Sequence, residues 1–191
     1  MRLLTLSLFV LLFQLILLFV FNFIEISAQQ ISKSTTDFNV YHNQNYSFEL
    51  MYPSNWTYVE FANQFIDTDL NVIASFISPL DSSNDPFQEF FTIKTKKLEP
   101  NNSFSNNINQ YLEKLKKSIT NINISKVDDI SDQSKYLKYS FSPQPGLVIN
   151  KTEYIFLNND NEIFHLEFTS NNNDKTFDLI INKIVSYFRI V

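Results

Sequence analysis

The stretch YSFELMYPSNW, residues 46–56, decides how this chain begins to fold. Its large apolar side chains recur at every second position, as Tyr46, Phe48, Leu50 and Tyr52. Successive side chains of a β-strand point to opposite faces, so this spacing predicts a strand with one apolar face. Pro53 cannot donate a hydrogen bond to a sheet, so we expect the strand to end there and a turn to lead to Trp56.

Further segments outward from this stretch have the pattern of strands, namely residues 56–61, 71–78, 90–98, 121–127, 136–142, 149–157 and 162–170. The asparagine-rich residues 158–161 join the last two, which predicts a hairpin. Apolar residues recur at helical spacing in residues 104–119 and 175–188. This order of elements predicts an α+β domain in which helices pack on a central, mostly antiparallel sheet.

The N-terminus carries an almost unbroken apolar run, residues 3–24, without a charged side chain. As a helix it would span about 33 Å, against a hydrocarbon core of about 30 Å. Residues 26–28 (ISA) resemble a cleavage site, so residues 1–28 are predicted to be either a signal peptide or a retained membrane anchor. Both interpretations place the rest outside the cytoplasm, anchored to the cytoplasmic membrane or secreted, with a linker at 29–37 and one domain at 38–191.

Composition excludes several classes of function. The net charge of −5 argues against nucleic acid as a partner, because phosphate binding needs clustered basic residues. Gly146 is the only glycine, whereas loops that cradle nucleotide phosphates need several. The chain has no cysteine, so it has neither a thiol nucleophile nor a disulfide.

Lysines cluster in two nearby segments, Lys94, Lys96 and Lys97 and then Lys114, Lys116 and Lys117. A solvated face of the domain is one interpretation of this cluster. Contact with anionic membrane headgroups is the other.

An acidic loop offers oxygen ligands for a weakly bound divalent cation at Asp81, Asp85 and Glu89. A calcium loop of the EF-hand type is excluded, because its sixth position needs glycine and holds Pro86 here. A cation site of another geometry and a solvated acidic turn both remain as interpretations.

His165 and Glu167 lie two residues apart, so they share one face of the predicted strand 162–170. Glu153 is expected to lie across the hairpin from them. This arrangement suits a metal site or an acid–base pair, although it lacks the spacing of a recognisable zinc site. The alternative is a histidine that only forms a structural hydrogen bond.

Three local patterns, together with the order of elements, resemble the PsbP-like family, whose members are related to the extrinsic PsbP subunit of the photosystem II oxygen-evolving complex. The stretch 46–56 resembles the family's opening strand, which ends in Tyr-Pro-X-X-Trp. Residues 73–89 (IASFISPLDSSNDPFQE) resemble its strand, acidic loop and following strand, and residues 184–188 (IVSYF) resemble its closing helix.

The resemblance covers residues 41–191 and implies an α/β/α sandwich. It also implies a non-catalytic binding or assembly module, because the family has no shared catalytic residues to carry over. We therefore expect an exported PsbP-like module at the outer face of the cytoplasmic membrane, with a membrane-associated protein complex as partner. An exported protein that binds a small ligand or a metal ion is the alternative.

Overall fold

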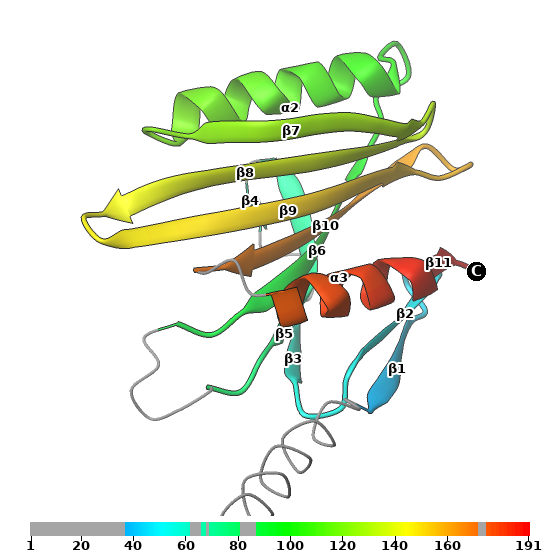
Figure 1. Ribbon diagram of the computed structural model, residues 1–191. Helices are drawn as coiled ribbons and strands as arrows, with labels where there is room; N and C mark the ends of the chain where they lie inside the picture. The colour runs from blue at the N-terminus through cyan, green and yellow to red at the C-terminus, as the bar shows by residue number, and fades with distance from the viewer. Residues whose placement is uncertain (1–36, 62–65, 68, 81–86, 172–174) are drawn as a thin grey trace, which may run out of the picture. The chain divides into compact units, whose positions relative to one another are not determined.

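The computed structural model describes residues 37–61, 66–67, 69–80, 87–171 and 175–191, of which Phe38–Val191 form one unit (Figure 1). The predicted signal peptide or anchor and the candidate ligands Asp81 and Asp85 lie outside the described residues. Within these ranges, no helix is long and apolar enough to cross a bilayer.

The domain is built on a large sheet in which every described pairing is antiparallel. In spatial order its strands are β3 (Thr57–Glu60), β5 (Leu70–Ile77), β6 (Phe90–Lys97), β10 (Glu162–Ser170), β9 (Leu147–Leu157), β8 (Ser134–Gln144) and β7 (Asn123–Ser131), and β4 (Ile66–Asp67) also pairs with β5. A smaller sheet has the order β1 (Phe38–Asn43), β2 (Phe48–Pro53) and β11 (Arg189–Ile190).

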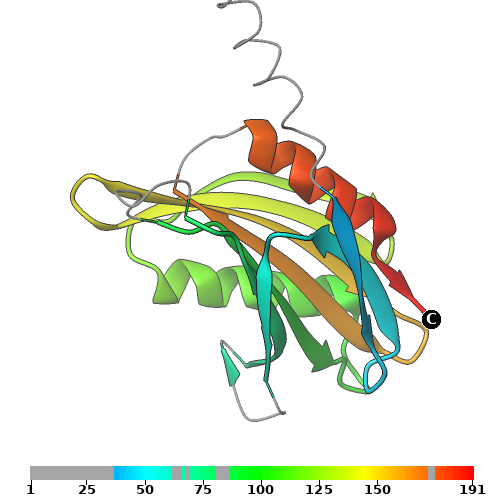
Figure 2. The same ribbon diagram turned by 90° about the horizontal axis from the view of Figure 1, so that it is seen from below.

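Two helices cover opposite faces of the large sheet (Figure 2). The side chains of β10 show this directly, because Phe164 packs in the same apolar cluster as helix α3 (Lys175–Tyr187), whereas its neighbour Ile163 packs with helix α2 (Phe104–Ser118). Adjacent strand residues point to opposite faces, so each helix has its own core. The predicted α+β fold, with helices on both sides of an antiparallel sheet, is confirmed.

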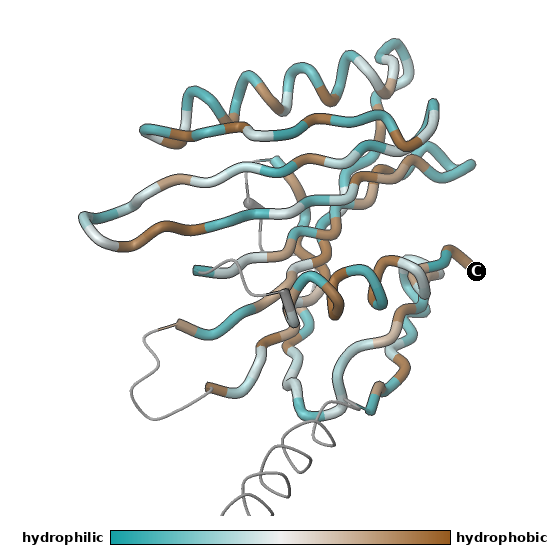
Figure 3. Tube along the Cα trace, in the orientation of Figure 1, coloured by the Kyte–Doolittle hydropathy of each residue, from teal (hydrophilic) through white to brown (hydrophobic). Residues whose placement is uncertain are grey.

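Both helices form because apolar residues recur along them between hydrophilic ones (Figure 3). The α2 helix begins at a cap, where the Ser103 hydroxyl accepts a hydrogen bond from the Asn106 backbone N–H at 3.1 Å. Its last turn carries Lys116 and Lys117, which suits the negative end of the helix dipole. The local sequence therefore specifies both the start and the end of α2.

The opening stretch forms a strand later than its alternation predicts. Ser47 has φ 49°, in the left-handed region, and the Asn43 side chain accepts a hydrogen bond from the Tyr46 backbone N–H. Tyr46 therefore belongs to the turn between β1 and β2, and the paired strand starts at Phe48. Trp56 is buried against other rings, with its ring centroid 6.2 Å from that of Phe177.

Candidate functional site

Charged side chains lie buried in the layer between helix α2 and the large sheet. Strand β10 aims His165 and Glu167 at this layer, and the sheet register places Lys94 opposite His165 and Glu153 opposite Glu167. Two tyrosines complete what we call the buried polar network, which consists of Lys94, Tyr111, Tyr139, Lys151, Glu153, His165 and Glu167. The juxtaposition of His165, Glu167 and Glu153 predicted from the hairpin is thus present.

Glu167 is the anionic centre of one half of this network. Its carboxylate accepts hydrogen bonds from the Lys94 ammonium at 3.2 Å and from the Lys151 ammonium at 2.5 Å. Burial by itself raises the pKa of Glu167, but the charges of Lys151 and Lys94 outweigh it and lower the pKa to about 2. Glu167 is therefore ionised and fully engaged with its two lysines.

Glu153 is the centre of the other half, and its side chain is fully buried. The Tyr111 hydroxyl donates to the Glu153 carboxylate at 3.1 Å, and Nδ1 of His165 lies 2.5 Å from Oε1 of the same carboxylate. Burial, followed by the charge of Glu153, raises the pKa of Tyr111 well above its ordinary value. Tyr111 is consequently a neutral hydrogen-bond donor to Glu153.

The edge of the network opens into a small pocket between α2 and the sheet. Its volume is about 20 Å³, which is room for about one water molecule. The lining residues come from β5, β6, β10 and α2 and are Leu70, Lys96, Asn107, Gln110, Tyr111, Lys114 and His165. We call it the α2 pocket.

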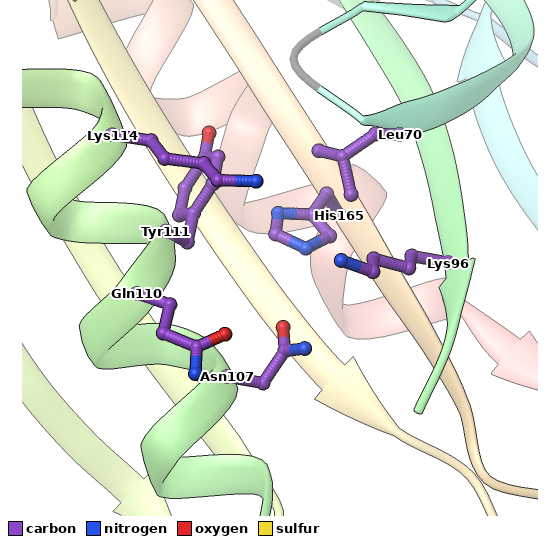
Figure 4. A pocket seen from close by; sticks show the side chains of 7 residues that line it. All are labelled: Leu70, Lys96, Asn107, Gln110, Tyr111, Lys114 and His165. Carbon is purple, nitrogen blue, oxygen red and sulfur yellow. The ribbon is translucent and has the colours of Figure 1, made fainter. Parts of the chain in front are cut away.

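Polar groups converge on the α2 pocket from both sides (Figure 4). The ammonium groups of Lys96 and Lys114 and the amide of Asn107 point toward the space in front of the His165 ring. Because Glu153 engages Nδ1 of His165, the histidine presents Nε2 as its remaining polar atom. The lining thus offers hydrogen-bond donors and positive charge on a rigid helix and sheet.

Glu89, the candidate ligand from the acidic loop that the structure describes, does not line this pocket. Glu89 lies within hydrogen-bonding reach of the Ser78 hydroxyl, at 3.4 Å, at the opposite end of β6 from Lys96. In the part of the chain that the structure describes, no group of three histidine, aspartate or glutamate side chains is arranged to hold a metal ion. The metal site therefore stays a sequence prediction.

The lysine cluster divides into residues with different surroundings. Lys94 is buried beside Glu167, Lys116 pairs with Glu113 on the exposed side of α2, and Lys96 and Lys114 face each other across the α2 pocket. The sequence analysis grouped these lysines but could not predict that Lys96 and Lys114 line the same pocket. It also missed Asn107 and Tyr111, whose helical spacing gave no signal of a polar role.

No protein-family model matches the sequence, and no curated protein matches it significantly. Solved structures do match. Cyanobacterial PsbP (CyanoP) from Synechocystis sp. PCC 6803 has a TM-score of 0.56 and 11% sequence identity, covering 83% of this chain and 95% of that chain. The chain has the PsbP-like fold.

The same fold extends to a second group of structures. The Ran-binding protein Mog1p of Saccharomyces cerevisiae has a TM-score of 0.53 and 8% identity, covering 82% of this chain and 97% of that chain. The resemblance that residues 46–56 and the closing helix predicted is therefore confirmed as a PsbP-like fold. At these identities the match concerns the fold, and function has to be argued from the site.

Proposed function

We propose that this chain is an exported, non-catalytic PsbP-like module that binds or assembles with another protein at the outer face of the cytoplasmic membrane. The α2 pocket is the observation that carries the proposal. Its volume of about 20 Å³ compares with about 300–1,000 Å³ for sites that enclose small organic ligands. A pocket of this size suits one protruding group of a larger partner.

The fold and the chemistry of the site support the same function. Mog1p, which shares the fold, is a Ran-binding protein. In the buried polar network, Glu167 is engaged by two lysines and Glu153 by Tyr111 and His165, so the network acts as a rigid support for the pocket. The apolar run at residues 3–24 supports export, since it has the length and composition of a membrane-crossing segment.

Site-specific photocrosslinking in intact cells of the native host tests the binding function. A photoreactive residue replaces Gln110, which lies at the pocket, or Asn182, which is exposed on α3 at the other face of the sheet. We expect a discrete crosslinked protein from position 110 and none from position 182. The absence of any discrete adduct from position 110 would contradict the proposal.

Protease accessibility tests the location. Protease added outside cells whose outer layers have been permeabilised should digest the domain while leaving cytoplasmic marker proteins intact. Digestion that begins only after the cytoplasmic membrane is lysed would place the domain on the other side and refute export.

The small-ligand or metal-binding alternative makes a different prediction. Dialysed protein would then show a higher melting temperature when divalent cations or the ligand are restored, because binding to the native state stabilises it. No shift with divalent cations is expected for a module whose site accepts a side chain of a partner protein.

A further inference from the structure

The α2 pocket combines two lysine ammonium groups with the side-chain amide of Asn107. Asn107 is 6% exposed, points into the pocket, and makes no side-chain hydrogen bond within the described part of the chain. Its amide therefore remains available to donate a hydrogen bond to a ligand that supplies an acceptor. Lys96 and Lys114 add two ammonium groups beside it.

The chain already supplies one carboxylate to this cluster. Asp69 forms a hydrogen-bonded ion pair with Lys114, and the Lys114 contact, followed by more distant attraction from Lys96, lowers the pKa of Asp69. Both side chains of this pair are more than half exposed, at 51% and 61%, so solvent weakens it. Breaking the Asp69–Lys114 ion pair therefore costs little free energy, so another carboxylate can replace Asp69 beside Lys114.

We propose that the α2 pocket binds a carboxylate of an Asp or Glu side chain on a partner protein, which displaces Asp69 from Lys114. The inference rests on the proposed protein-binding function and specifies the chemistry of that site. A carboxylate oxygen needs about the space of one water molecule, which is the space present. It would accept hydrogen bonds from Lys96, Lys114 and Asn107, and the partner's backbone would remain outside.

His165 reports on the pocket without being altered. The chain contains only two histidines, so selective isotope labelling of histidine gives two ring signals by NMR. His42 lies on β1 and forms part of neither the pocket nor the network, which makes it an internal reference. Acetate added to the full-length protein in mild detergent should shift the His165 signals saturably and leave those of His42 unchanged.

Three substitutions distinguish a specific site from general attraction to a charged surface. Lys96→Gln should weaken acetate binding by about fivefold or more, because it removes one of two cations. Asp69→Asn should strengthen binding by a similar factor, since it removes the internal competitor, and asparagine tolerates the observed φ of 70°. Lys97→Gln, at the exposed neighbouring position, should leave binding unchanged.

The contrary results are equally definite. An absence of any saturable shift at His165, or weakening by Lys97→Gln as large as by Lys96→Gln, would overturn the carboxylate site. So would weaker binding in Asp69→Asn, because the inference makes Asp69 a competitor for the same cations.

A cellular experiment separates this inference from the function on which it rests. Lys96→Gln should abolish the protein adduct formed from position 110, and Lys97→Gln should retain it. An adduct that survives Lys96→Gln would overturn the carboxylate inference while leaving the binding function intact. Acetate binding without any adduct would overturn the protein partner and leave a site for free small carboxylates.

Membrane headgroups offer the competing anion. Vesicles of phosphatidylglycerol should bind wild-type protein and Lys96→Gln equally after removal of acetate. Vesicle binding that depends on Lys96 and competes with acetate would overturn the assignment to a protein carboxylate.

Discussion

At the scale of single residues, Glu167 shows how ion pairs offset the desolvation cost of a buried charge in this domain. It lies between Lys94 and Lys151, and all three would be costly to bury alone. Glu167→Gln keeps the shape of the side chain but leaves two buried or half-buried lysines without an anion. We expect the free energy of unfolding in urea to fall by about 3 kcal/mol. Glu113→Gln, which breaks the exposed pair with Lys116, should change it by less than about 0.5 kcal/mol.

The same residue gives the domain a pH dependence. Folding lowers the pKa of Glu167 from its ordinary 4.5 to about 2. The native state therefore holds this proton less tightly than the unfolded state, and the stabilisation is present above about pH 4.5 and lost as the pH falls toward 2. Urea unfolding from about pH 6 to about pH 3 should show the difference between wild type and Glu167→Gln shrinking. A constant difference would show that Glu167 stabilises by packing alone.

Two threonines in the sheet allow a test of buried hydroxyl groups. Thr169 Oγ1 is buried and has no hydrogen-bond partner among the described residues, whereas Thr95 Oγ1 lies 2.5 Å from Glu162 Oε1 and 3.0 Å from the Ile163 carbonyl oxygen. Valine has the same shape without the hydroxyl. Thr169→Val should raise the free energy of unfolding by about 1 kcal/mol, and Thr95→Val should lower it by about 1–2 kcal/mol. Opposite signs are the decisive outcome, and equal losses in both variants would refute this explanation.

At the scale of elements, the hairpin between β9 and β10 depends on asparagine in place of glycine. Asn161 has φ 60°, and the Asn158 side chain accepts hydrogen bonds from the backbone N–H groups of Asp160 and Glu162 at 2.9 and 2.8 Å. Asn161→Gly should be nearly neutral, because glycine adopts this conformation freely. Asn161→Val should cost about 1–2 kcal/mol in unfolding measurements, since a β-branched residue is strained there. Equal stability of the two variants would show that the turn relaxes.

Local patterns predicted the elements that depend on local sequence. Strand β10 spans the predicted residues 162–170, and α2 and α3 each end one residue before their predicted ends. Strands β1 and β11 were missed because each is specified by pairing with β2, as in Arg189 opposite Glu49, far apart in sequence. The β1 strand buries only two of its six side chains and β11 has only two residues, so neither has enough apolar periodicity to identify a strand from sequence.

In the candidate site, too, contacts within one hairpin were predictable from the sequence, whereas contacts between the helix and the sheet were not. Glu153 and His165 face each other because a hairpin register follows from its turn, and that register could be read from residues 158–161. Lys96 and Lys114 line the same pocket only because α2 packs against the sheet near β6 and β10. No sequence pattern along the chain predicts that packing. Tyr111 lies in the apolar stripe of α2, where its aromatic ring alone accounts for its position. The sequence therefore gave no reason to expect that its hydroxyl would donate to Glu153.

At the scale of the molecule, both apolar cores and the α2 pocket lie within Phe38–Val191. A domain of this size buries about 70% of the surface of its unfolded chain, which is enough for independent stability without disulfides. A fragment of residues 37–191 should therefore unfold in one transition, with a free energy within about 0.5 kcal/mol of the full chain in the same mild detergent.

The single tryptophan provides the measurement for this fragment. Trp56 packs against Phe91 of the sheet and Phe177 of α3, so its fluorescence reports whether α3 remains docked. If the domain is independent, the fluorescence transition in urea coincides with the loss of secondary structure by circular dichroism, and acetate shifts His165 as in the full chain. Aggregation of the fragment would mean that residues 1–36 contribute to the stability of the domain itself. So would a fluorescence transition at a much lower urea concentration than the circular dichroism transition. In that case the N-terminal segment could not be only an export signal or anchor.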